Sequence, residues 1–368
     1  MTKVRHVLGI SGGKDSAALA IYMKQRYPEL DIEYYTCDTG KELDETYQLI
    51  KNLEVYLGKP ITRLVAAEKS TQNPFDHYLQ LYGGYLPSSN SRWCTKKLKL
   101  DPFEKLVGTT PVISYVGIRG DEDREGYISK KSNIQSIFPF RKNIWSEDVI
   151  SKVLANNNLK TVAGLLEQLP DTNSSTRFAD LLSKPLSFSF TQPQKLNLLL
   201  DTDTKLFNQL VFQFLKQTAY PLATEAGFPL LENDEVLVRD DIFRLLEECG
   251  VGVPAYYNKV DFSVNGQTGH YSRSRSGCYF CFYQQKIEWI WLYEQHPDRF
   301  AAAMEYEKEG YTWNDDERLE DMIRPERMEA IKAEYIKRTA RNKQKTKSPY
   351  LLGILDETEG EGCAACFI

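Results

Sequence analysis

The sequence predicts an α/β protein built on a parallel twisted sheet, joined by a mainly helical insertion and a helical C-terminal region. Through residues 1–120, apolar strand-like runs alternate with amphipathic helical segments. A glycine-rich turn joins the first run to the first helix, and residues 151–235 form a Leu-rich stretch with helical spacing. The repeated strand–helix order places helices on both faces of the sheet.

Strands are expected at four positions, which are residues 4–10, 31–37, 61–65 and 111–118. Residues 42–57 are expected to form an amphipathic helix. We expect it to end at Gly58, which follows it directly. Ligands of parallel sheets bind beyond the carboxyl ends of the strands. Ser11, Asp38 and Arg119 each follow a predicted strand, so we expect these side chains to share one crevice.

Four segments are expected along the chain. An α/β core over residues 1–150 ends with a short strand at residues 138–140 and a helix that begins near Trp145. The insertion, residues 151–235, is expected to have a small leucine core of its own. Residues 236–345 complete the α/β core and include a polar Gly/Ser loop at 265–276, and residues 346–368 are expected to be a flexible tail.

Composition limits the classes of protein that this chain can be. No apolar run has the length of a membrane span and the N-terminus lacks a secretory pattern, so we expect a cytoplasmic protein with no membrane partner. The net charge of −5 excludes a general nucleic-acid coat, although the basic stretch 324–347 is either a local patch for a phosphate backbone or a solvated face. Seven cysteines, an odd number, argue against a disulfide framework.

The turn after the first strand has the chemistry of a phosphate site. Its residues, called here the phosphate loop, are Ser11-Gly12-Gly13-Lys14-Asp15-Ser16. The two glycines permit close approach of a phosphate, the lysine neutralises charge, and the aspartate is a candidate ligand of Mg²⁺. A Walker A loop is excluded because it requires Ser or Thr directly after the lysine. The alternative is an ordinary glycine turn.

Two later strand ends carry further candidate nucleotide contacts. Asp38 is a candidate for contact with a ribose or a metal, and its alternative role is to cap the helix that follows. Gly117 and Arg119 follow the last predicted strand of this region, and the guanidinium of Arg119 can bind a phosphate through two hydrogen bonds.

Three cysteines are candidates for metal or sulfur chemistry. Cys94 lies in a basic segment that favours the thiolate, which can be a nucleophile, a persulfide carrier or a metal ligand, or else is a buried structural cysteine. Cys278 and Cys281 have a spacing that suits two ligands of one metal, with Cys94 as the third. An iron–sulfur cluster, zinc and a redox dithiol all stay open.

The fourth metal ligand also stays open, among His270, Cys249 and the C-terminal pair Cys363 and Cys366. This terminal pair has a second interpretation as a mobile dithiol that accepts or relays sulfur. A third interpretation is an unordered end without a role.

The phosphate loop resembles the PP-loop of the ATP pyrophosphatases, which cleave ATP between the α and β phosphates. Together with four other segments it resembles the phosphoadenosine-phosphosulfate (PAPS) reductase family of the PP-loop superfamily, and these segments are residues 37–40, 92–99, 117–121 and 277–281. The resemblance implies an adenine nucleotide alpha hydrolase-like fold. Sulfonucleotide reductases carry a C-terminal Glu-Cys-Gly-His type motif, whereas this sequence has Gly362-Cys363-Ala364-Ala365-Cys366.

The Arg92-Trp93-Cys94 segment and the Cys278/Cys281 pair are more similar to the ATP pyrophosphatase component of Dnd- and Ssp-type DNA phosphorothioation systems. This resemblance implies ATP with Mg²⁺, DNA as substrate, a cysteine desulfurase as partner and homo- or hetero-oligomers. It implies catalytic roles for Lys14, Asp15, Cys94 and Arg119. The alternatives are a tRNA thiolation enzyme, a sulfonucleotide reductase and a non-catalytic ATP-binding scaffold for a desulfurase.

Overall fold

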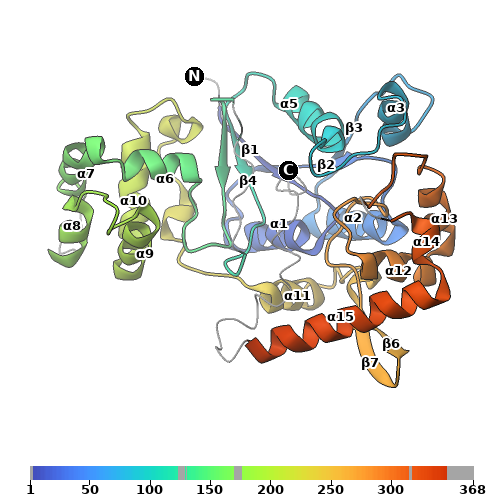
Figure 1. Ribbon diagram of the computed structural model, residues 1–368. Helices are drawn as coiled ribbons and strands as arrows, with labels where there is room; N and C mark the ends of the chain where they lie inside the picture. The colour runs from blue at the N-terminus through green and yellow to red at the C-terminus, as the bar shows by residue number, and fades with distance from the viewer. Residues whose placement is uncertain (1–2, 123–128, 130, 170–175, 315–316, 346–368) are drawn as a thin grey trace.

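The computed structural model describes residues 3–122, 129, 131–169, 176–314 and 317–345 (Figure 1). In this described part, a five-stranded sheet has the order β3-β2-β1-β4-β5, and all of its neighbouring strands are parallel. Its strands are β1 (Arg5–Gly9), β2 (Ile32–Asp38), β3 (Ile61–Val65), β4 (Val112–Tyr115) and β5 (Ile134–Ile137). The α/β fold class predicted from the sequence is confirmed.

Two strand predictions require correction. The strand expected at 111–118 ends at Tyr115, because the chain then turns out of the sheet with Ile118 N–H bonded to the Val116 carbonyl. The short strand expected at 138–140 lies earlier, at β5. Pro139 has no N–H to donate to a sheet, and Arg141 N–H bonds to the Phe138 carbonyl in a turn.

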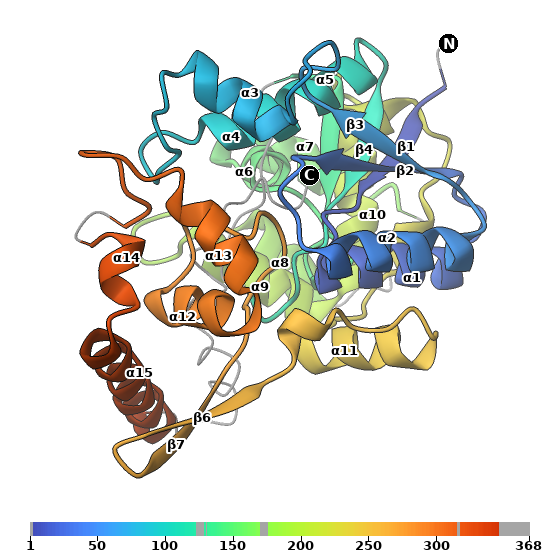
Figure 2. The same cartoon turned by 90° about the vertical axis from the view of Figure 1, so that its right-hand side faces the viewer.

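Helices cover both faces of the sheet. Figures 1 and 2 show α1 (Lys14–Arg26), α2 (Asp44–Leu57) and α11 (Arg239–Glu248) on one face, and α5 (Asp101–Val107) on the other. The side chains of β1 point alternately to these two faces. Leu8 belongs to the core cluster of α1, whereas Val7 packs with Phe103 of α5. Helix α1 lies between the sheet and α11. This position buries the whole N-terminal half of α1.

The insertion forms a helical lobe beside β4 and β5 (Figure 1). Its helices are α6 (Glu147–Val153), α7 (Leu159–Leu166), α8 (Thr176–Ser183), α9 (Gln192–Thr202), α10 (Thr204–Leu215) and the 3₁₀ turns η3 (Pro221–Thr224) and η4 (Pro229–Glu232). The expectation that its leucines form a separate core is wrong. Leu165, Leu199 and Leu230 belong to the same buried cluster as Leu8 of the sheet, and Trp145 and Leu222 connect the two parts.

The C-terminal region builds a second buried cluster, rich in aromatic rings. Its helices are α12 (Lys286–Gln295), α13 (Pro297–Met304), α14 (Leu319–Met322) and α15 (Pro325–Lys345). They pack with α3 (Pro74–Leu81) and α4 (Trp93–Thr95); Phe280 stacks on Trp313 with ring centroids 4.8 Å apart, and Phe75 lies against both rings. In the described ranges, no helix is both long enough and apolar enough to span a membrane.

Part of the loop expected at 265–276 is a β-hairpin. Strand β6 (Val260–Val264) pairs antiparallel with β7 (Gln267–Tyr271) across the dipeptide Asn265-Gly266. Both turn residues have positive φ, 51° and 74°, as a tight two-residue hairpin turn requires. The Asn-Gly dipeptide between alternating residues is the sequence signal that predicts this hairpin.

Candidate active site

The phosphate loop lies where the strand order of the sheet reverses. From β1, strands β2 and β3 extend toward one edge of the sheet, whereas β4 and β5 extend toward the other. The carboxyl ends of β1 and β4 therefore form the crevice typical of ligand sites. The hydroxyls of Ser11 and Ser16 are hydrogen-bonded at 3.0 Å, and Ser16 Oγ also accepts from Ser11 N–H at 3.1 Å. These bonds close the loop over the N-terminus of α1, where backbone N–H groups favour anions.

At both glycines of the phosphate loop, close neighbours leave no room for a Cβ atom. Gly12 has φ of +75°, and a Cβ there would lie 2.2 Å from Thr46 Cγ2 of α2. At Gly13, a Cβ would lie 2.4 Å from Ser276 Oγ. The loop is therefore held between α2 and the segment that precedes Cys278, so two distant parts of the chain fix its shape.

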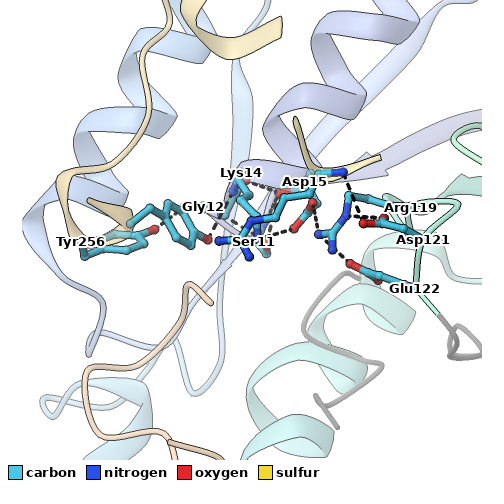
Figure 3. Close-up of polar contacts among 12 residues, drawn as sticks. Ser11, Gly12, Lys14, Asp15, Arg119, Asp121, Glu122 and Tyr256 are labelled. Carbon is cyan, nitrogen blue, oxygen red and sulfur yellow. Dashed lines mark hydrogen bonds and ion pairs between the residues drawn. The ribbon is translucent and has the colours of Figure 1, made fainter. Parts of the chain in front are cut away.

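A buried cluster of charges adjoins the loop (Figure 3). Arg119 Nη1 lies 2.8 Å from Asp15 Oδ1 and 2.8 Å from Glu122 Oε1, and Arg119 Nε bonds to Asp121 at 2.9 Å. Lys14 Nζ lies 3.3 Å from the other oxygen of Asp15. Lys14, Asp15 and Arg119 are each at most 4% exposed. The structure thus places Arg119 against Asp15 of the loop that begins at Ser11, whereas the crevice predicted from the sequence was to be shared by Ser11, Asp38 and Arg119.

This pairing bears on the prediction that Asp15 binds Mg²⁺. Each carboxylate oxygen of Asp15 already faces a cation, so binding of Mg²⁺ would require one of these ion pairs to open. Among the described residues, no group of three or more His, Cys, Asp or Glu side chains is arranged to hold a metal ion. The magnesium role of Asp15 stays a prediction, and no chemical step below passes through it.

Gly117 acts through packing. A Cβ at this position would lie 2.9 Å from the Asp15 carbonyl oxygen, so only glycine lets the chain after β4 run directly against the first turn of α1. This close approach is what carries Arg119 to Asp15. The sequence analysis proposed Gly117 for contact with a nucleotide, and the structure gives it a positioning role beside the phosphate loop.

Asp38 is buried at the end of β2 and orders the turn that follows. Its Oδ1 accepts from Gly40 N–H at 2.7 Å and from the Tyr47 hydroxyl at 3.0 Å, and Arg63 pairs with the second oxygen. It does not cap α2, whose N-cap residue is Leu43 and has no side-chain bond. Contact of Asp38 with a ribose or metal stays a prediction.

Two tyrosines that the sequence analysis missed hold the loop from the C-terminal region. The Tyr256 hydroxyl donates to the Gly12 carbonyl at 3.0 Å, and its burial raises the pKa of this phenol strongly. The Tyr257 hydroxyl accepts from Lys14 N–H at 3.4 Å, and the Lys14 ammonium lies 4.9 Å from the centre of the Tyr257 ring. A Tyr-Tyr pair carries no sequence signal that connects it to a loop so far away in the chain.

The three candidate cysteines line one small cavity of about 40 Å³. Cys94 comes from α4, whereas Cys278 and Cys281 come from the turn before α12, and Lys99 and Thr39 share the lining. Cys278 Sγ lies 3.2 Å from Thr39 Oγ1, and burial raises the pKa of this thiol well above its ordinary value. Ser276 lines the same cavity and also touches the position of Gly13, so the thiols adjoin the phosphate loop.

The other proposed metal ligands lie elsewhere. His270 is on β7, half exposed, and its Nδ1 lies 2.6 Å from Asp261. The Cys249 thiol bonds to the Leu246 carbonyl and packs against the main core. Neither residue lines the thiol cavity. Cys363 and Cys366 lie outside the described residues. A metal site at Cys94, Cys278 and Cys281 therefore stays a prediction, and we derive no step through a cluster or zinc.

Some cations of the basic stretch 324–347 make contacts within the protein. On α15, Lys332 bonds to Glu294 at 2.6 Å, and Arg338 bonds to Gln285. These two cations anchor α15 on α12. They are therefore less available for a phosphate backbone than the sequence pattern alone indicates.

A doubly covered parallel sheet with a phosphate loop at its switch point defines a nucleotide-binding α/β protein. Residues 5–167 match the family model described as the phosphoadenosine phosphosulfate reductase domain. The matched span includes the whole sheet and the phosphate loop. This match supports the PP-loop superfamily and an enzyme of the nucleotide-using type.

Two relatives are similar to part of the chain. An uncharacterized protein of Methanocaldococcus jannaschii is 30% identical over 154 residues, which are 38% of this chain and 30% of the relative. An uncharacterized nin region protein of Escherichia phage lambda is 30% identical over 145 residues, which are 32% of this chain and 49% of the relative. The chain thus matches less than half of the length of each relative.

Proposed function

We propose that this protein is an ATP pyrophosphatase that adenylates a backbone phosphate of DNA and replaces one of its oxygens by sulfur. The observation that carries the proposal is the shared wall of two sites. Ser276 contacts the phosphate loop at Gly13 and also lines the cavity of Cys94, Cys278 and Cys281. The closeness of the thiol cavity to the phosphate loop supports a reaction in which activation by ATP is followed by sulfur transfer.

The first step is adenylation. A non-bridging oxygen of the DNA phosphate attacks the α-phosphorus of ATP, a new P–O bond forms, and the bond to the β-phosphate oxygen breaks with release of pyrophosphate. Lys14, Arg119 and the N-terminus of α1 supply positive charge where negative charge moves onto the leaving group. The triphosphate would compete with Asp15 for both cations.

The second step is sulfur transfer. The terminal sulfur of a persulfide, formed on Cys94 by a cysteine desulfurase, attacks the activated phosphorus and expels AMP together with the original oxygen. A second thiol of the cavity then attacks the Cys94 sulfur. The S–S bond breaks, its electron pair stays on the phosphorothioate sulfur, and a protein disulfide forms. An external dithiol must reduce that disulfide before the next turnover.

The choice of DNA rests on the resemblance of two segments, Arg92-Trp93-Cys94 and the Cys278/Cys281 turn, to DNA phosphorothioation enzymes. Mass spectrometry of digested DNA and tRNA, from cells with and without the gene, tests it. We expect phosphorothioate dinucleotides that disappear on deletion and do not return with Cys94→Ser. Cys249→Ser is the matched control, because that thiol packs against the main core. Loss of thionucleosides from tRNA instead would replace DNA by tRNA as the target.

A second candidate, reduction of a sulfonucleotide, is favoured by the match of residues 5–167 to the PAPS reductase domain. Incubation of the protein with PAPS and a dithiol separates the two. Release of sulfite without ATP would support the reductase, whereas its absence together with release of pyrophosphate from ATP supports our proposal. A scaffold that only binds ATP would release neither product.

A further inference from the structure

A second, larger cavity lies at the edge of the sheet, separate from the phosphate loop. It has a volume of about 720 Å³, which is within the range of sites for small ligands such as nucleotides. Strand β3, helix α3 and helix α5 surround it, and Figures 1 and 2 show these three elements together at that edge. We call this cavity the edge cleft.

The lining of the edge cleft is cationic at its rim. Four permanent cations, Arg63, Lys69, Lys97 and Lys105, face two carboxylates, Glu68 and Asp101. Lys97 bonds to Asp101 at 2.8 Å and Lys105 to Glu68 at 3.2 Å, so each carboxylate has its own lysine. Arg63 pairs with Asp38 at the end of β2, so Lys69 is the lining cation that leaves the cleft with excess positive charge, which favours an anionic ligand.

The walls of the edge cleft are apolar and aromatic. Leu64, Val65, Leu106, His77 and Tyr78 contribute to its lining, and Tyr78 also packs against the aromatic cluster of the C-terminal region. The two rings are 5.2 Å apart at an interplanar angle of 84°, so a flat ligand can lie on one ring while its edge meets the other. An apolar wall, an aromatic ring and a cationic rim are the three features that bind an unstacked nucleotide.

Two local features of the backbone shape this cleft. Ala67, in the turn after β3, has φ of +56°, a conformation that is uncommon for residues other than glycine and is found at functional sites. Residues Lys96–Leu100 form a π-helical turn, η1, which is also frequent at functional sites. This turn directs Lys97 to the edge cleft, whereas Lys99 lines the thiol cavity. One turn of helix thus lies between the two sites.

We propose that the edge cleft binds a nucleotide of a single-stranded nucleic-acid segment, with its phosphate at Lys69 and its base against Tyr78. The inference rests on the proposed function for its biological meaning, because it gives the nucleic-acid substrate a path that ends near the thiols. The binding itself requires neither ATP nor sulfur, so it can be measured alone.

The test is fluorescence anisotropy of a short, labelled single-stranded DNA oligonucleotide with the full-length protein and without ATP. Lys69→Glu should weaken binding about tenfold. It should also reduce the slope of log K against log salt concentration by about one in magnitude. The matched control is Lys142→Glu, an exposed lysine that pairs with Asp201 of the lobe and gives the same change in net charge. Equal weakening by both variants would overturn the proposal.

The base contact is tested at Tyr78. Tyr78→Leu should weaken oligonucleotide binding about tenfold, whereas Tyr78→Phe, which keeps the ring, should restore it. Competition with free thymidine monophosphate separates a polymer from a free nucleotide. Equal affinity for the monophosphate and the oligonucleotide would contradict binding of a strand.

The outcomes also separate this inference from the proposed function. Binding that depends on Lys69 and Tyr78 without any release of pyrophosphate would leave the cleft standing and remove adenylation. Release of pyrophosphate with DNA, combined with unchanged oligonucleotide binding by Lys69→Glu and Tyr78→Leu, would support adenylation and remove the edge cleft as a binding site.

Discussion

Two cations and three carboxylates share the buried space beside the phosphate loop. Arg119 contacts Asp15, Asp121 and Glu122, while Lys14 also contacts Asp15. Buried charges are stable only when they are paired, and removal of one partner leaves another uncompensated. In our proposal, the phosphates of ATP displace Asp15 from Lys14 and Arg119 when the nucleotide binds.

The position of Arg119 depends on Gly117, which gives the first prediction. Gly117→Ala should lower the free energy of unfolding by about 1–3 kcal/mol and slow the cleavage of ATP, because the added Cβ meets the backbone of Asp15. Urea unfolding and the rate of pyrophosphate release measure the two effects. Gly164→Ala is the control, since no atom lies within 4 Å of that Cβ in α7. Similar behaviour of both variants would refute the positioning role.

At the residue scale, the sequence predicts a crevice shared by Ser11, Asp38 and Arg119, because parallel strands place their carboxyl ends at one edge of the sheet. Arg119 lies against Asp15 of the loop that begins at Ser11, whereas Asp38 orders the turn after β2, so a shared nucleotide site stays a prediction. Tyr256 and Ser276 could not be found in this way. Their contacts with the loop depend on how the C-terminal region packs over α2 and α1, which no local pattern encodes.

At the scale of elements, one carboxylate adds to the contacts of Lys332 and Arg338 that hold α15 to α12. Glu317 accepts from Arg327 at 2.5 and 2.8 Å and from Lys286 at 2.9 Å. The hydrogen bonds from Arg327, and then those from Lys286, lower the pKa of Glu317 to about 2. This single side chain therefore connects the helix that follows the Cys278 turn with the long C-terminal helix.

The second prediction concerns acid stability. The folded pKa of Glu317 lies below its ordinary value of 4.5, so the stabilisation is complete above about pH 4.5 and is lost as the pH falls toward 2. Glu317→Gln should be less stable than wild type at neutral pH, and the difference should shrink over that acid range. Urea midpoints at several pH values measure this. Glu320→Gln, at a half-exposed pair with Arg318, should change little. A constant difference at every pH would contradict the assignment.

Elements were predictable from sequence to different degrees. The helix that ends at Gly58 and the strand β3 match their predicted positions, because each combines a clear period with a turn residue. The hairpin β6–β7 was missed because Gly, Ser and polar residues dominate residues 265–276. Only five residues of each strand pair there, so the alternating signal is short and the Asn-Gly turn carries most of it.

For the whole molecule, the helical lobe and the sheet are joined by buried polar bonds as well as by apolar contacts. Asn208 of α10 accepts from Trp145 Nε1 at 2.9 Å, and the Tyr22 hydroxyl of α1 donates to Asn233 at 3.1 Å. Asn233 in turn donates to the Pro139 carbonyl at 2.8 Å. Leucine spacing predicted the helices of the lobe correctly, but it contains no information about which surface they cover. For that reason the predicted separate core was wrong.

The third prediction is that the lobe and the sheet open together. Hydrogen exchange of peptides from α10 and β1 should give the same opening free energy, because one core contains both. Asn208→Ala leaves Trp145 Nε1 and two carbonyls without a partner, and it should lower both values equally, by about 2–4 kcal/mol. The neighbouring exposed Gln209→Ala is the control. A decrease confined to α10 would mean that the lobe unfolds independently.

The measurement that tests the central claim most directly is the identity of the products formed from ATP. The protein is incubated with ATP labelled at the α-phosphate, Mg²⁺ and DNA, and the nucleotides are separated. We predict AMP and pyrophosphate in equal amounts in the presence of a persulfide donor. Lys14→Gln, which removes a cation that the proposal places at the leaving phosphates, should reduce both products at least about 100-fold, whereas Lys142→Gln should not. Formation of ADP and phosphate, or equal product formation by Lys14→Gln and wild type, would contradict the account.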